Sequence, residues 1–155
     1  MLVTFFLLYA IKYYMIRFEK IPEDILSRLP QLEQLFNKEE EVIFAYLFGS
    51  LAKGKQPPLA DVDIAVYLKN LEALADYKVD LFLKLSDVLG TSEIDLVILN
   101  TAPISLAGRI LQGRRIIIDK EPFKRHIYES LTLREFFDFQ VHETRLLSLR
   151  YGSGR

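Results

Sequence analysis

Apolar and polar positions along the chain follow two periods, one typical of strands and the other of helices. Residues 42–48 form a continuous apolar run that ends at Gly49, which predicts a strand buried on both faces. Across residues 61–68 apolar and polar positions alternate, which predicts a second strand with Asp61 and Asp63 on one face. Shorter apolar runs predict two further strands, at residues 93–99 and 115–118.

Helical periodicity separates these strands. Acidic residues that follow Pro22 indicate the first turn of a helix, which Pro30 should kink or split near Arg28. An apolar stripe over residues 71–89 ends at Gly90, a typical C-terminal cap. Two more helices are expected, at residues 104–111 and 122–151. This order predicts an α/β or α+β fold, with a small mixed sheet flanked by helices and a helical C-terminal tail.

Composition narrows the class of protein. Half of the 155 residues are hydrophobic, which excludes disorder and predicts one domain over residues 1–155 with a helical C-terminal region. The chain has no Cys, which excludes disulfides and thiolate metal sites and fits the cytoplasm. Its 20 Lys and Arg nearly balance 21 Asp and Glu. We therefore expect no direct binding of nucleic acid.

The chain opens with an apolar segment. Ten apolar or small residues after Met1 are interrupted by Lys12, whereas a membrane-spanning helix needs about 20. The segment also lacks the basic start and the cleavage site of a signal peptide, so we expect neither a membrane anchor nor secretion. Residues 1–14 are either a mis-annotated extension before a natural start at Met15, or an added buried strand or helix.

Three carboxylates on the predicted strands form a candidate metal site. Asp61 and Asp63 would have Cα atoms about 6.5 Å apart and point the same way, near enough to bridge two cations. Asp95 lies within an apolar run, where burying a carboxylate without a partner would be costly. Carboxylate oxygens suit Mg²⁺, and the phosphates of a nucleoside triphosphate would complete its coordination shell.

The turn after the first strand is a candidate phosphate site. Gly49 permits a tight turn against a ligand, and Ser50 is placed to cap a following helix whose N–H groups face an anion. Lys53 and Lys55 are placed to neutralise phosphate. A solvated strand end or a plain turn would explain each feature alone, but their combination favours a site for metal and phosphate.

Three stretches carry a family resemblance: Leu-Phe-Gly-Ser-Leu-Ala-Lys-Gly at 47–54, Asp-Val-Asp-Ile-Ala-Val at 61–66 and Glu-Ile-Asp-Leu-Val at 93–97. Together they resemble the minimal nucleotidyltransferases of the DNA polymerase beta superfamily, and within it the MNT antitoxins encoded beside HEPN toxins. The chain departs from the family pattern at two positions. Lys53 stands where members often have Arg, and Ala60 stands where Ser commonly precedes the first Asp. Neither departure removes a metal ligand.

The resemblance implies a polymerase-beta-like fold, with ATP as the nucleotide donor and two Mg²⁺ ions as cofactors. It implies that Asp61 and Asp63 hold both ions on the triphosphate, and that Asp95 binds the catalytic ion and helps to deprotonate the acceptor. Gly49 and Ser50 would grip the β and γ phosphates. The acceptor that the resemblance implies is a tyrosine hydroxyl of a cognate HEPN toxin, which adenylylation would inactivate.

Two alternatives to protein adenylylation stay open. The chain would either mask its toxin by binding alone, or transfer a nucleotide to a small hydroxyl compound such as an aminoglycoside. The chain does not resemble the toxin itself, whose Arg-x4-His-x-Tyr motif would require Arg at the position of Glu121, before His126 and Tyr128. Neither histidine of the chain, His126 or His142, lies in a zinc-binding pattern.

The predicted C-terminal helix has more apolar residues than one buried stripe requires. They are Phe136, Phe137, Phe139, Val141, Leu146, Leu147 and Leu149. Packing in the core explains them, and so does an interface in a homo- or hetero-oligomer. The sequence favours the core.

Overall fold

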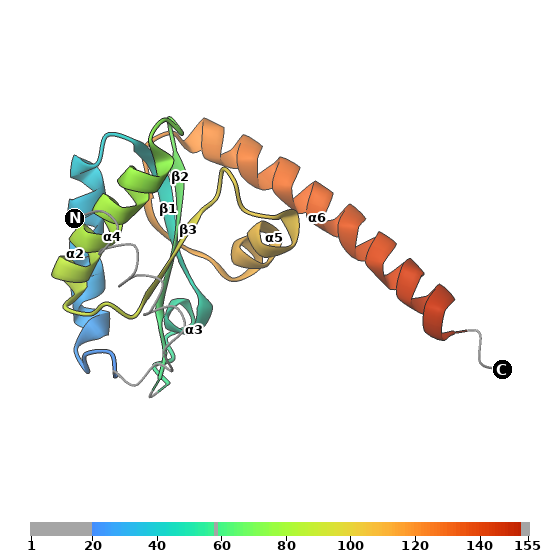
Figure 1. Ribbon diagram of the computed structural model, residues 1–155, viewed down its shortest axis with the longest axis horizontal. Coiled ribbons are helices and arrows are strands. Elements are labelled where there is room, and N and C mark those ends of the chain that lie inside the picture. Colours follow the sequence, from blue (N-terminus) through green and yellow to red (C-terminus); the bar gives the residue numbers. More distant parts are fainter. Residues whose placement is uncertain (1–19, 58, 153–155) are drawn as a thin grey trace.

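A four-stranded mixed sheet lies at the centre of the computed structural model, which describes residues 20–57 and 59–152 (Figure 1). Its strands are β1 (Val42–Phe48), β2 (Val62–Leu68), β3 (Ile94–Ile98) and β4 (Arg115–Asp119), in the order β3-β2-β1-β4. Strand β2 pairs in parallel with β3, whereas β1 pairs antiparallel with β2 and β4. The expectations for residues 1–14 lie outside the described residues.

Helices cover both faces of this sheet. One face carries α2 (Ile25–Lys38) and α4 (Leu74–Leu89), and the other carries α5 (Ile104–Gly113) and α6 (Pro122–Tyr151) (Figure 1). The short helix α3 (Gly49–Ala52) directly follows β1. The predicted mixed sheet flanked by helices is therefore confirmed. In the described part of the chain, no helix is both long and apolar enough to cross a bilayer.

The alternation along β2 explains the two layers of helices. Val62, Ile64 and Val66 are fully buried in the cluster beneath α2 and α4. Ala65 and Tyr67 point to the opposite face and pack in the cluster beneath α5 and α6. Strand β1 lies between β2 and β4, and its first six residues are buried. The predicted burial of β1 on both faces is confirmed.

Helix α2 differs from its prediction. It begins at Ile25 and runs as one helix through Pro30, so the expectation that Pro30 would split it is wrong. Pro30 lies on the exposed side, where water can satisfy the carbonyl left without its helical donor. Leu32 and Phe36, both fully buried, follow Pro30 and hold the second half of the helix against the sheet. Packing therefore outweighs the loss of one backbone hydrogen bond.

Helix α4 begins at Leu74, three residues later than predicted, and ends as expected at Gly90 with φ of 68°. The guanidinium of Arg28 occupies the space beside Gly90, because an added Cβ would lie 2.1 Å from its Nη1 atom. Arg28 also donates a hydrogen bond to the carbonyl of Leu89 at 3.1 Å. A side chain of α2 thus satisfies the C-terminal end of α4.

A buried ionic network fastens the first half of α6 to the sheet. Glu129, with its side chain 9% exposed, accepts hydrogen bonds from Tyr46 Oη at 2.7 Å, Arg125 Nη1 at 2.9 Å and Arg114 Nε at 3.0 Å. Arg125 also donates to Asp119 at 2.7 Å. Burial acts to raise the pKa of Glu129, but the three donors outweigh it and hold that pKa below its ordinary value.

We predict that Glu129→Gln lowers the free energy of unfolding at neutral pH by about 3 kcal/mol, because Arg114 and Arg125 would lose their buried carboxylate. The folded pKa of Glu129 is depressed, so its stabilisation is complete above the ordinary value of 4.5 and disappears as pH falls through the folded value. Urea denaturation at pH 7 and about pH 3 measures both effects.

The matched control is Glu121→Gln, which neutralises an exposed acid at the start of the same helix. We expect this change to stay within about 0.5 kcal/mol of the parent. If the free energies of unfolding of the parent and Glu129→Gln differ by the same amount at both pH values, the electrostatic explanation is wrong.

Candidate active site

Strands β2 and β3 bring the predicted carboxylates to one end of the sheet. Asp63 is the Cα partner of Asp95 across the parallel pair, and on its other side it pairs with Phe48, the last residue of β1. Asp61 directly precedes β2, two residues before Asp63. Since residues two apart on a strand and residues paired across it share a face, the three carboxylates belong to the face covered by α5 and α6.

The exposure of these acids differs from the prediction at one position. Asp61 and Asp63 are partly exposed, whereas Asp95 is exposed. The expectation that Asp95 would be buried at a cost is wrong, because β3 is an edge strand and one face of it remains open at this position. Among residues 20–57 and 59–152, no three His, Cys, Asp or Glu side chains converge into a ready-made metal cluster.

Gly49 forms a cradle for the carboxylate of Asp63. The residue has φ of 71°, and a Cβ added to it would lie 2.0 Å from Oδ2 of Asp63 and 2.9 Å from its Cγ. The side chain of Asp63 therefore rests against the backbone of the turn, a contact that the sequence did not predict. Hard oxygen donors set directly against a glycine turn fit Mg²⁺ carried by a triphosphate, since Mg²⁺ takes few protein ligands and several from substrate.

Ser50 lies differently from the expectation. The N-cap of α3 is Phe48 and makes no side-chain cap, so the prediction that Ser50 caps this helix is wrong. The Ser50 carbonyl instead accepts hydrogen bonds from the backbone N–H groups of Lys53 and Lys55, at 3.1 and 3.0 Å. Both lysines are exposed, and the stem of Lys53 passes 3.9 Å from the Cβ position of Gly113, at the end of α5.

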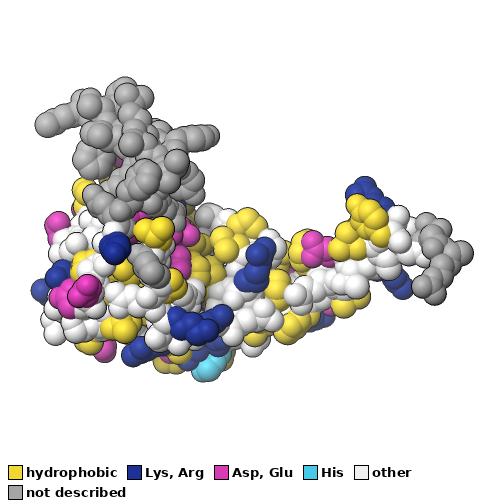
Figure 2. Space-filling model, turned by 90° about the horizontal axis from the view of Figure 1, so that it is seen from below, with side chains coloured by type: hydrophobic (Ala, Val, Ile, Leu, Met, Phe, Trp, Pro, Cys, Tyr) yellow, Lys and Arg dark blue, Asp and Glu magenta, His cyan; other side chains and the backbone are white. Residues whose placement is uncertain are grey.

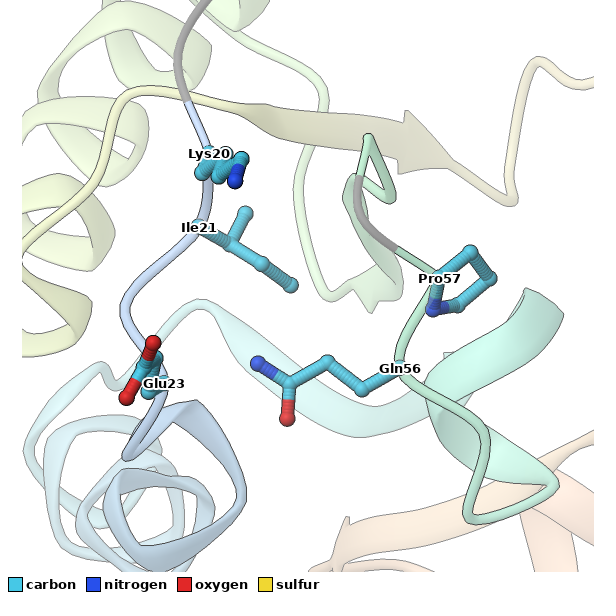
Figure 3. A pocket seen from close by; sticks show the side chains of 5 residues that line it. All are labelled: Lys20, Ile21, Glu23, Gln56 and Pro57. Atoms are coloured by element: carbon cyan, nitrogen blue, oxygen red, sulfur yellow. The ribbon is translucent and has the colours of Figure 1, made fainter.

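A cavity of about 300 Å³ lies beside the loop that leads from α3 to Asp61 (Figure 3). It is lined by Lys20, Ile21, Glu23, Gln56 and Pro57. Gln56 donates a hydrogen bond to the carbonyl of Pro22 at 3.0 Å, which fixes this loop to the start of α2. No pattern in the sequence predicts this contact, because a glutamine in a polar loop follows no periodicity. The three carboxylates are not among the residues that line this cavity.

The sequence of residues 30–123 matches the family described as Polymerase beta, Nucleotidyltransferase. The chain belongs to this family. The match includes the glycine turn and all three carboxylates, so the predicted membership of the superfamily is confirmed. No curated protein matches the chain.

Several solved structures share the fold. A toxin–antitoxin structure with AMP-PNP is 22% identical, with a TM-score of 0.63, and the match covers 78% of this chain and 95% of that one. One chain in the structure of a tri-AMPylated Shewanella oneidensis HEPN toxin in complex with MNT antitoxin is 20% identical, with a TM-score of 0.61. The match covers 80% of this chain and 96% of that one. An MntA-HpeT toxin–antitoxin mutant is 20% identical, with a TM-score of 0.64 and coverage of 78% and 95%. The predicted likeness to MNT antitoxins is therefore confirmed at the level of the fold.

We predict that Gly49→Ala destabilises the protein more than Gly54→Ala. Both glycines have positive φ, 71° and 69°, so each alanine costs about 1–2 kcal/mol in backbone strain. A Cβ at Gly49 also collides with the carboxylate of Asp63, whereas nothing lies within 4 Å of a Cβ at Gly54. We expect the collision to add about 1–3 kcal/mol, measured by chemical denaturation. If both variants lose the same free energy of unfolding, the carboxylate of Asp63 does not lie against Gly49 as described.

Proposed function

We propose that the chain is a Mg²⁺-dependent nucleotidyltransferase that moves AMP from ATP to a tyrosine hydroxyl of a cognate HEPN toxin, and so acts as an antitoxin. The observation that carries this proposal is the placement of Asp63, opposite Asp95 and against the backbone of Gly49. Membership of the polymerase beta nucleotidyltransferase family supports the chemistry. The structural neighbours that hold AMP-PNP, or an AMPylated HEPN toxin, support the donor and the acceptor.

Each residue of the site has a distinct role in this proposal. Asp61 and Asp63 would hold two Mg²⁺ ions, and Asp95 would share one of them on the acceptor side. When bound, these ions would offset the charge of the triphosphate and of the attacking and leaving oxygens. The backbone at Gly49 and Ser50 would contact the β and γ phosphates, and Lys53 would add positive charge at their edge.

The proposed transfer conserves atoms and charge. The acceptor oxygen forms a bond to the α-phosphorus of ATP while the bond from that phosphorus to the bridging oxygen breaks, and pyrophosphate leaves. Asp95 receives the proton of the acceptor hydroxyl and later releases it to water. An open edge strand at Asp95 suits a protein acceptor, because a side chain of a second protein can approach the exposed carboxylate.

The setting of this reaction follows from its substrates. ATP and Mg²⁺ are abundant in the cytoplasm, and a chain without cysteine has no need of an oxidising compartment. We therefore propose that the chain acts there, on a HEPN toxin encoded beside it.

We predict that Asp61→Asn with Asp63→Asn abolishes transfer, with a loss of at least about 100-fold, because the ligands that would position the metal-bound triphosphate are removed. The chain and the neighbouring HEPN protein are incubated with Mg²⁺ and α-labelled ATP. Intact-mass analysis then counts AMP units on the HEPN protein.

Asp87→Asn is the matched control, since it removes an exposed carboxylate of α4 outside the site. This control should transfer AMP as the parent does. A tight complex without any transfer would overturn adenylylation and leave a masking antitoxin. Labelling of an aminoglycoside in place of the protein would instead support a small-molecule transferase.

A further inference from the structure

Helix α6 extends well beyond the body of the protein (Figure 1). Its last buried residue is Phe136, whose ring packs so closely on Gly108 of α5 that an added Cβ would lie 2.1 Å from Cγ. Every residue from 137 to 151 is exposed. We call residues 137–151 the arm. The view from below also shows the arm projecting away from the body, with hydrophobic side chains along it (Figure 2).

The arm is apolar on more than one side. Val141 and Tyr151 lie about 40° to either side of Phe137 around the helix axis, and Phe139 and Leu146 share a roughly opposite face. All five side chains are exposed, by 39% to 79%. A helix with apolar residues on opposite faces is normally buried. The expectation that these residues pack in the core is wrong for all except Phe136.

The size of this surface matches a stable interface. Seven apolar side chains of the arm are exposed, the five above with Leu147 and Leu149. If a fully exposed large side chain presents about 150–250 Å², their exposed fractions correspond to roughly 600–1,000 Å² in all. A stable complex buries about 800 Å² on each partner. Two acids and two arginines in the arm balance one another, so the partner should offer an apolar groove rather than a charged surface.

The arm extends from a helix that covers the sheet face of the three carboxylates. Helices α5 and α6 pack on the sheet face to which Asp61, Asp63 and Asp95 belong. The network around Glu129 fastens the first half of α6 to β1 and β4, so the arm keeps a fixed direction relative to that face. A protein that encloses the arm would therefore be held on the same side of the sheet as the exposed carboxylate of Asp95.

We infer that the arm is the docking surface for the HEPN toxin, an inference that rests on the proposed function. The toxin encloses the arm in an apolar groove, in the manner of a helix-in-groove complex. A second copy of this chain fits the arm less well. Pairing of two arms along one stripe would leave the opposite apolar face of each arm in water.

The test uses the full chain with Leu146→Glu and Leu149→Glu, and the HEPN protein encoded beside it. Both positions are exposed and helical, and glutamate is a good helix former, so folding should not change. We expect the Kd of the complex to rise at least about tenfold, the effect of losing one central apolar contact. AMP transfer at low toxin concentration should fall by the same factor and recover when the toxin is saturating.

The matched control is Leu71→Glu with Leu83→Glu, which adds the same charges at exposed leucines outside the arm. This control should bind as the parent does. An unchanged Kd for the arm variant, or no complex with the parent chain, overturns the docking inference. So does a parent dimer in light scattering that the arm variant alone disrupts, because the arm would then bind a second copy.

The docking inference and the adenylylation proposal fail in different ways. Binding that depends on the arm without AMP transfer by the parent upholds docking and overturns adenylylation. Transfer of AMP by both the parent and the arm variant, at equal rates and low toxin concentration, upholds adenylylation and overturns docking.

Discussion

The parallel pairing of β2 with β3 is the constraint on which the site depends. This register sets Asp63 opposite Asp95, and a slip of one residue would turn one of the two carboxylates to the other face of the sheet. The apolar residues next to the acids hold the register, because Val62, Ile64 and Leu96 all lie in the core cluster beneath α2 and α4. The same alternation that builds one layer of the core thus aims the carboxylates at the opposite layer.

The turn at Gly49 completes this arrangement from the neighbouring strand. Phe48 pairs with Asp63, so the residue that follows β1 must pass beside the Asp63 carboxylate, and only a hydrogen atom fits between them. The glycine therefore serves the geometry of the carboxylate as well as the conformation of the turn. On the same face of the sheet, the buried carboxylate of Glu129 accepts a hydrogen bond from the hydroxyl of Tyr46 and ties α6 to the same strand. Strand β1 therefore contacts both Asp63 of the site and the half of α6 from which the arm extends.

The sequence predicted the elements well where a pattern is local. The apolar run of β1, the alternation of β2 and the helix over residues 122–151 all agree with the structure. It failed where the outcome depends on elements far apart in the chain. The exposure of Asp95 follows from β3 lying at the edge, and strand order cannot be read from periodicity. The Glu129 network joins residues 83 positions apart. The apolar residues of the arm are exposed because no other element of the described chain packs on them.

The most direct test of the account is a crystal structure of the chain with Mg²⁺ and a non-hydrolysable ATP analogue. The account predicts Mg²⁺ on the carboxylates of Asp61 and Asp63, with phosphate oxygens against the backbone of Gly49. A nucleotide bound elsewhere, such as in the cavity beside Gln56 and Pro57, with no metal on these carboxylates, would contradict it.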